Sequence, residues 1–209
     1  MSHVDTGLLI VDVQNDFCAG GSLPVLGGEE VARPLSRLAH LVALAGGPVF
    51  ASRDWHPEKS SHFVEWGGKW PPHCVQGTEG AEFHPDLELP EDAETISEGT
   101  TFGDEGYSAF DGTDGDGRPL DLLLKRAGVS RLYVGGLATD ACVQASVFDA
   151  IGKGYEVRLI VDAIRALDLD PGDGERAVTE MRIAGARLTT VEAVVRDLEL
   201  VLETRSGAP

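Results

Sequence analysis

The stretch RLYVGGLATDACVQASVFDA, residues 131–150, decides the fold class of this chain. Residues 131–137 are a short, almost continuous apolar run, which is typical of a parallel strand covered on both faces. Residues 139–153 then carry apolar side chains at helical spacing. A buried strand followed at once by a helix predicts an α/β protein.

The same alternation continues in both directions along the chain. We expect further strands at 7–13, 47–54, 156–163 and 186–194, a weaker one at 93–97, and helices at 29–45, 119–127, 173–184 and 192–203. Such alternation implies a doubly wound, mostly parallel six-stranded sheet with right-handed crossovers. Neither a repeat nor a linker divides the sequence, so we expect residues 1–209 to form a single domain.

The charge balance limits the classes of partner. The chain has 35 acidic and 17 basic residues and a net charge of −18, which disfavours nucleic acid and anionic membranes. Its three cysteines are an odd number, which favours reduced thiols over a disulfide framework. No apolar stretch is long enough for a signal peptide or a membrane span, so we expect a cytoplasmic protein.

Chemically active residues follow several of the expected strands. Sites in doubly wound sheets lie beyond the carboxyl ends of the strands, where Asp12, Asp54 and Cys142 fall. If Thr139 or Asp140 caps the helix, Cys142 lies in its first turn, where the helix dipole favours a thiolate. The alternative is a small cysteine packed in the core, and the pattern alone leaves both open.

A second set of chemically active residues lies in the long irregular stretch 53–90, where Asp54 is followed by His56, His62 and His73. One carboxylate with two or three imidazoles suits zinc, iron or manganese. The alternative is that these are ordinary surface histidines of a loop. The remaining histidines are isolated and are not expected to bind metal: His3, His40 and His84.

Five segments of the chain together resemble one known family. They are IVDVQNDFCAGGSLPV (10–25), ASRDWHPEKSSHF (51–63), WPPHCVQGTEGAEFHPDL (70–87), GYSAFDG (106–112) and VGGLATDACVQASVFDA (134–150). In content and order they resemble the nicotinamidase/pyrazinamidase branch of the isochorismatase-like cysteine hydrolases. The resemblance implies the three-layer isochorismatase-like fold and, since such proteins often assemble into dimers or larger oligomers, a homo-oligomer.

The resemblance also implies roles for the reactive groups. It makes Asp12 the general base and Cys142 the nucleophile. It makes Asp54, His56 and His73 the ligands of one divalent metal ion, with His62 as a further or water-mediated ligand. Zinc is the first expectation for that ion, with iron and manganese as alternatives.

The expected pocket follows from the same resemblance. The peptide between Leu137 and Ala138 is expected to be cis, and the N–H groups of Ala138 and Cys142 are expected to form the oxyanion hole. The expected substrate is a small, heteroaromatic carboxamide, hydrolysed to acid and ammonia through a Cys142 thioester. Three aromatic residues match those that enclose the substrate ring: Phe17, Trp70 and Tyr107.

One residue departs from the family pattern. Glu98 stands where the resemblance places a catalytic lysine. A glutamate beside Asp12 is expected to share a proton with it and to raise the pKa of Cys142. Three accounts remain open: an acid–base pair of Glu98 and Asp12 acting on another amide, such as a cyclic one; a small-molecule binding relative with little turnover; or a nicotinamidase altered at this position.

Overall fold

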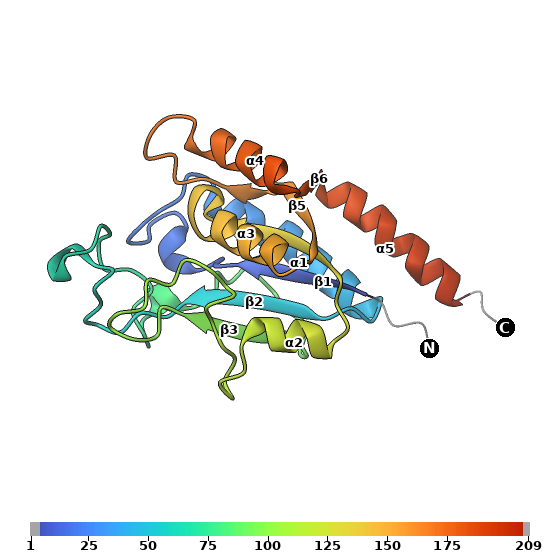
Figure 1. The fold of residues 1–209 in the computed structure, drawn as a ribbon, viewed down its shortest axis with the longest axis horizontal. Helices are drawn as coiled ribbons and strands as arrows, with labels where there is room; N and C mark the ends of the chain where they lie inside the picture. The colour runs from blue at the N-terminus through green and yellow to red at the C-terminus, as the bar shows by residue number, and fades with distance from the viewer. Residues whose placement is uncertain (1–4, 207–209) are drawn as a thin grey trace.

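A six-stranded parallel sheet runs through the middle of the molecule (Figure 1), whose computed structural model describes residues 5–206. In chain order the strands are β1 (Thr6–Val11), β2 (Val49–Asp54), β3 (Glu94–Glu98), β4 (Arg131–Leu137), β5 (Glu156–Arg165) and β6 (Arg187–Thr189). Their order in the sheet is β3-β2-β1-β4-β5-β6, and every neighbouring pair is parallel. The expected doubly wound sheet is confirmed, with the weaker strand present as β3. The strand order reverses between β1 and β4, which is where such folds bind ligands.

Helices cover both faces of the sheet. On one face lie α1 (Ala32–Leu44) and α5 (Val191–Ser206), and on the other lie α2 (Leu120–Arg126), α3 (Gln144–Gly152) and α4 (Asp173–Ala184). Strand β1 shows why its sequence is continuously apolar: Leu8 and Ile10 pack with the first layer, whereas Leu9 and Val11 pack with the second. Each such buried side chain contributes about 1.5–3 kcal/mol.

The strand expected at 186–194 is much shorter in the structure, where β6 ends at Thr189. Two side-chain acceptors start helix α5 instead. The Val191 N–H donates to Asp162 Oδ1 at 2.8 Å, and the Ala193 N–H donates to Thr190 Oγ1 at 3.3 Å. These bonds satisfy N–H groups that have no partner within the first helical turn.

The helix expected from residue 139 begins with a π-helical turn, Thr139–Val143, which leads into α3. The expected side-chain cap by Thr139 or Asp140 is wrong, because the turn has no side-chain cap. The Asp140 carboxylate accepts hydrogen bonds from the N–H groups of Leu167 and Asp168 at 2.8 and 2.9 Å. Asp140 therefore fixes the loop after β5 against the start of this turn.

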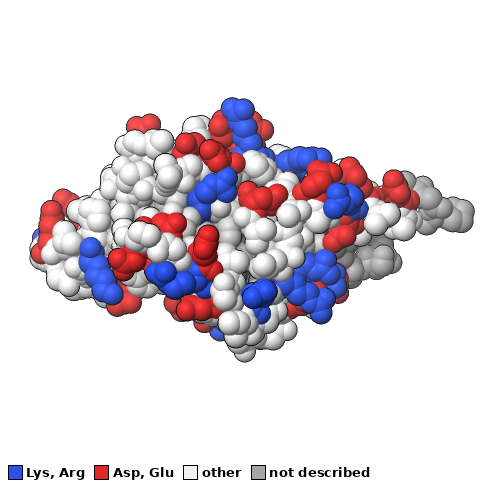
Figure 2. Space-filling model, turned by 90° about the horizontal axis from the view of Figure 1, so that it is seen from above, with Lys and Arg blue, Asp and Glu red and all other residues white. Residues whose placement is uncertain are grey.

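The surface carries charges of both signs. Figure 2 shows acidic and basic side chains interspersed over one face of the molecule, so the net charge is not gathered there into a single acidic patch. Within residues 5–206, none of the helices combines the length and the apolar character needed to cross a membrane.

Candidate active site

Four reactive side chains meet where neighbouring strands end. Asp12 directly follows β1, Asp54 ends β2, Glu98 ends β3, and Cys142 lies in the turn after β4. Asp54 and Glu98 are direct partners in the parallel register. Asp12 and Glu98 have no exposed surface, and Asp54 and Cys142 are also buried. The structure therefore brings together residues that lie up to 130 positions apart along the chain.

The first cluster, called here the histidine group, consists of Asp54, His56, His62 and His73. Ligand nitrogen atoms of the three histidines lie within 4.8 Å of one another. The rings of His56 and His62 are stacked, with centroids 4.6 Å apart. Asp54 faces two of the rings, with its Oδ1 3.4 Å from His56 Nε2 and its Oδ2 3.4 Å from His73 Nε2.

The hydrogen bonds of two rings fix which nitrogen is free. His56 Nδ1 lies 3.2 Å from the Gly99 carbonyl oxygen, and His73 Nδ1 lies 2.7 Å from that of Pro71. Because a carbonyl oxygen only accepts, both Nδ1 atoms carry protons, and each neutral ring has its lone pair on Nε2. These lone pairs face carboxylate oxygens, and both His56 Nε2 and Asp54 Oδ1 lack a hydrogen-bond partner. A divalent cation between them removes the repulsion, so the donor set fits a metal ion.

The pKa values agree with that interpretation. Burial raises the pKa of Asp54, but its interactions with the facing His56 and His73 rings outweigh burial and lower it overall. Burial lowers the pKa of His62 to about 4, so this ring is neutral near pH 7. Burial also lowers the pKa of His73, but Asp54 outweighs this effect and raises it. Asp54 therefore favours a positive charge at the position between its carboxylate and His73 Nε2.

The second cluster, called here the carboxylate group, consists of Asp12, Glu98 and the shared Asp54. Carboxylate oxygens of the three residues lie within 4.8 Å of one another. Asp12 Oδ1 accepts a hydrogen bond from Ser52 Oγ at 2.6 Å. Burial, followed by the charge of Asp54, raises the pKa of Asp12 to about 7. Burial, followed by the charge of Asp12, raises the pKa of Glu98 well above its ordinary value.

Cys142 borders the carboxylate group, and its thiol hydrogen-bonds with Asp12. Burial raises the pKa of Cys142 well above its ordinary value, and the charges of Asp12, Asp54 and Glu98 raise it further. The prediction that the helix N-terminus favours the thiolate is therefore wrong, because burial and three acidic neighbours outweigh it. The charge of Glu98 acts on this pKa in the expected direction. In the free protein Cys142 is a thiol that needs a base.

The backbone around Cys142 has the form that the family resemblance implies. The peptide between Leu137 and Ala138 is cis, and the turn that holds Cys142 follows directly. Ala138 and Cys142 both line one narrow cavity.

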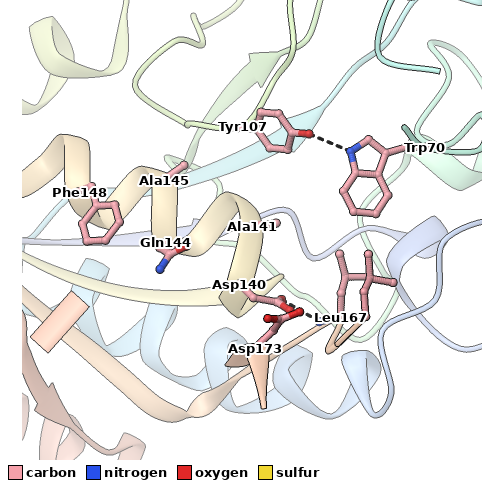
Figure 3. A pocket seen from close by; sticks show the side chains of 10 residues that line it. Trp70, Tyr107, Asp140, Ala141, Gln144, Ala145, Phe148, Leu167 and Asp173 are labelled. Atoms are coloured by element: carbon pink, nitrogen blue, oxygen red, sulfur yellow. Dashed lines mark hydrogen bonds between the residues drawn. The ribbon is translucent and has the colours of Figure 1, made fainter. Parts of the chain in front are cut away.

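The three expected aromatic residues line that same cavity, together with His62 and His73. Trp70 Nε1 donates a hydrogen bond to the Tyr107 hydroxyl at 2.9 Å (Figure 3), and Phe17 packs against His73 with ring centroids 5.4 Å apart. The cavity has a volume of about 20 Å³, roughly the space of one water molecule. A ring-shaped substrate therefore has to displace some of these side chains to reach Cys142.

A wider pocket of about 380 Å³ adjoins the narrow cavity (Figure 3). The two share four lining residues: Trp70, Tyr107, Ala141 and Leu167. Beyond them Phe148 contributes an apolar side, and Asp140, Gln144 and Asp173 contribute polar groups. The outer pocket therefore offers room for a part of a ligand that extends away from Cys142.

Sequence analysis missed three supporting residues. Ser52 precedes Asp54 by two positions on one strand, so alternation could have placed both side chains on the same side. Gln14 accepts from the Asp54 N–H at 2.9 Å and donates to the Asp54 carbonyl at 2.8 Å, and nothing in the local sequence indicates this. Gly99 has a φ of +65°, and a Cβ there would lie 2.4 Å from the His56 ring, so a side chain would displace that ring.

The parallel sheet carries a buried cysteine, an aspartate and a group of three histidines that could hold a metal ion at the reversal of its strand order. Residues 6–193 match the model of the isochorismatase domain, so the chain belongs to the isochorismatase family. Within that family it is a nicotinamidase-like hydrolase.

The similar proteins cover nearly the whole chain. A nicotinamidase/pyrazinamidase of Mycobacterium tuberculosis is 40% identical over 87% of this chain and 96% of its own length. A nicotinamidase of Escherichia coli is 38% identical over 88% of this chain and 94% of its own. The crystal structure of a pyrazinamidase of Pyrococcus horikoshii in complex with zinc superposes with a TM-score of 0.82 at 40% identity, covering 90% of this chain and 99% of that one.

Proposed function

We propose that this protein hydrolyses a small, flat carboxamide of the nicotinamide type to the carboxylic acid and ammonia. The observation that carries the proposal is the contact of Cys142 with Asp12 at the end of an aromatic-lined cavity. The 38–40% identity to nicotinamidases supports the choice of substrate.

Asp12 acts as the general base in this proposal. Its pKa of about 7, raised by burial and then by Asp54, suits a group that takes up and releases a proton near neutral pH. Asp12 takes the proton of the Cys142 thiol while the sulfur attacks the amide carbon. The N–H groups of Ala138 and Cys142 donate to the oxygen of the tetrahedral intermediate.

The second half of the reaction uses the same residues. Asp12 gives its proton to the leaving amine, so ammonia departs and an acyl thioester remains on Cys142. Water, deprotonated by Asp12, then attacks the thioester, and the carboxylate leaves as Cys142 regains a proton. Both half-reactions balance without an oxidant or a reductant.

The histidine group is proposed to hold zinc, since imidazoles and one carboxylate suit that ion, with iron or manganese as alternatives. When bound, the ion supplies a positively charged group able to coordinate a ring nitrogen or a water molecule. His62, His73 and the aromatic residues line the cavity and orient the ring, with Trp70 and Tyr107 held together by their hydrogen bond.

The first experiment measures ammonia release from nicotinamide by the zinc-loaded protein, with Cys142→Ala as a control that lacks the thiol. Turnover in the wild-type protein and none in the variant supports the proposal. A Glu98→Lys variant is assayed beside them. If only this variant releases ammonia, the pocket accepts nicotinamide but the natural protein acts on another substrate. If none of the proteins releases ammonia, nicotinamide is excluded as the substrate.

A second candidate is a larger carboxamide, with Glu98 taking part in its reaction. The observation that favours it is the outer pocket (Figure 3), which shares Trp70 and Tyr107 with the narrow cavity. Its acidic residues, Asp140 and Asp173, favour a substituent that is cationic or donates hydrogen bonds. Comparing kcat/KM for nicotinamide and for ring-substituted nicotinamides tests it, because this candidate predicts the higher value for the extended amides.

A further inference from the structure

We propose that the carboxylate group binds a second cation, distinct from the metal ion of the histidine group, with Asp54 bridging the two positions. The chemical class is a divalent cation that prefers oxygen ligands, such as Mg²⁺ or Mn²⁺. The proposal concerns ion binding alone and does not depend on which amide the protein hydrolyses.

The first observation is a set of buried oxygens without donors. Beyond the hydrogen bond that Asp12 and Glu98 share, Asp12 Oδ2, Asp54 Oδ1 and both Glu98 oxygens have no hydrogen-bond partner among the described residues. Asp12 and Glu98 have no exposed surface and Asp54 is 2% exposed, so bulk water does not solvate these atoms. Buried carboxylate oxygens without donors or a counter-charge are strongly destabilising, which calls for a ligand at this position.

The second observation is the absence of a positively charged side chain. Over residues 5–206, the ion pairs of the carboxylate group are those of Asp54 with His56 and His73. Asp12 receives a hydrogen bond from Ser52, which is neutral, and Glu98 hydrogen-bonds with Asp12 but takes part in none of the ion pairs of the described residues. Three carboxyl groups therefore share one buried space without a lysine or an arginine to balance them.

The count of oxygens favours a cation over a shared proton. One proton joins two oxygens in a single O–H···O bond, so it leaves two of the four unpaired. A cation with six or more ligand positions has enough of them for all four. The geometry agrees for one oxygen of each residue. Oxygens bound to one cation at about 2.0–2.6 Å lie no more than roughly 4–5 Å apart, and one oxygen from each of the three carboxyl groups lies within 4.8 Å of the other two.

The two positions differ in their donors. The histidine group offers mainly imidazole nitrogen, which suits zinc, whereas the carboxylate group offers oxygen alone, which suits Mg²⁺ and Mn²⁺. A site of each type can therefore be filled selectively. Asp54 belongs to both, and a carboxylate that bridges two cations is common in centres with two metals.

The test is binding of Mn²⁺ to the zinc-loaded protein, without substrate. Zinc binds nitrogen-rich sites more tightly than manganese does, so it keeps the histidine group while Mn²⁺ is added. Loss of the free Mn²⁺ signal in electron paramagnetic resonance counts the bound ions. The expected result is one bound Mn²⁺ per chain beside one retained zinc ion.

Variants of Glu98 then locate the ion. Glu98→Gln is expected to weaken Mn²⁺ binding by more than about 100-fold, since even the loss of an indirect partner of a metal ligand costs 10- to 100-fold. Glu98→Lys is expected to abolish it, because the ammonium group occupies the same place. The matched control is Glu105→Gln, which removes an exposed acid from the loop after β3 and should bind Mn²⁺ as the wild-type protein does.

Two results overturn the proposal. One is a zinc-loaded wild-type protein that binds no Mn²⁺, and the other is Mn²⁺ binding that is equal in Glu98→Gln and in the wild-type protein. Circular dichroism of each variant shows whether it is folded, and the wild-type stoichiometry stands without any variant. Failure of nicotinamide hydrolysis leaves this result untouched, so the two proposals fail separately.

Discussion

The histidine group and the carboxylate group share Asp54 but differ in the hydrogen-bond partners of their buried polar atoms. In the histidine group two rings donate through Nδ1 to backbone carbonyls, and their Nε2 atoms face the carboxylate of Asp54. In the carboxylate group Asp12 accepts from Ser52, whereas Glu98 hydrogen-bonds with Asp12 and receives no donor from outside the group among the described residues. The first group is prepared for one metal ion by its own hydrogen bonds. The second is an accumulation of negative charge whose behaviour depends on the ions and protons that reach it.

Removing Cys142, which borders the carboxylate group, has the largest expected effect. Cys142→Ala should lower kcat by about 10⁴-fold or more, because the nucleophile and its base act as one unit. Its zinc content should stay that of the wild-type protein, since Cys142 is outside the histidine group. Ammonia assays and elemental analysis on the same preparation check both points. Retained activity would show that Cys142 is not the nucleophile of the reaction.

His73→Ala tests whether the histidine group is the metal site. It removes an imidazole that faces Asp54 at 3.4 Å, so zinc affinity should fall by more than about 100-fold. The measurement is zinc retained after dialysis against a series of chelator concentrations. The control is His40→Ala, which changes an exposed histidine on α1 and should retain zinc normally. Equal retention in both variants would contradict the assignment of the histidine group as the metal site.

Glu98→Gln should stabilise the metal-free protein. The raised pKa of Glu98 means that the folded state holds its proton more tightly than the unfolded state does. Below the ordinary pKa of 4.5, Glu98 is mostly protonated in both states and costs no stability. As pH rises from 4.5 through the raised pKa, the folded state becomes less stable relative to the unfolded state. The glutamine amide does not ionise and can donate to Asp12, so we expect a gain of about 1–3 kcal/mol at pH 8.

Denaturant unfolding in the presence of chelator, at pH 5 and pH 8, measures this difference. The gain should shrink at pH 5, because this pH lies close to the ordinary pKa of 4.5 and the stability lost to the raised pKa of Glu98 accumulates only as pH rises above it. A variant that is less stable than the wild-type protein at both pH values would show that Glu98 has a compensating partner.

Ser52→Ala has the smallest expected effect. The Ser52 hydroxyl donates to Asp12 Oδ1 at 2.6 Å and lowers the pKa of Asp12, against the larger effect of burial. Its loss should raise that pKa, so the acidic limb of the kcat/KM profile should move to higher pH by about half to one unit, the equivalent of one hydrogen bond. A profile that moves to lower pH would contradict the role of Asp12 as the base.

The parts of the fold that follow from local pattern could be predicted from the sequence. Strands β1, β2 and β4 are continuously apolar because each is buried on both faces, and their ends placed Asp12, Asp54 and Cys142 on one edge. The length of β6, at the edge of the sheet, was predicted less accurately. Val191 and Val194 suggested a longer strand, but Asp162 and Thr190 accept hydrogen bonds from the N–H groups of Val191 and Ala193, and a helix starts there.

The candidate site shows the same division. His56 and His73 could be recognised as metal-type residues from their spacing around Asp54. The pKa of Cys142 could not, because it depends on burial and on acidic groups of three other strands rather than on its own turn. Gln14 was also missed, since its hydrogen bonds to the Asp54 backbone join positions 40 residues apart.

The measurement that tests the account most directly is mass spectrometry of the zinc-loaded protein quenched with acid during turnover of nicotinamide. The account predicts one acyl group, bound as a thioester to the peptide that contains Cys142, and its disappearance in Cys142→Ala. Ammonia release without an acyl group on Cys142, or with one on Cys18 or Cys74, would contradict it.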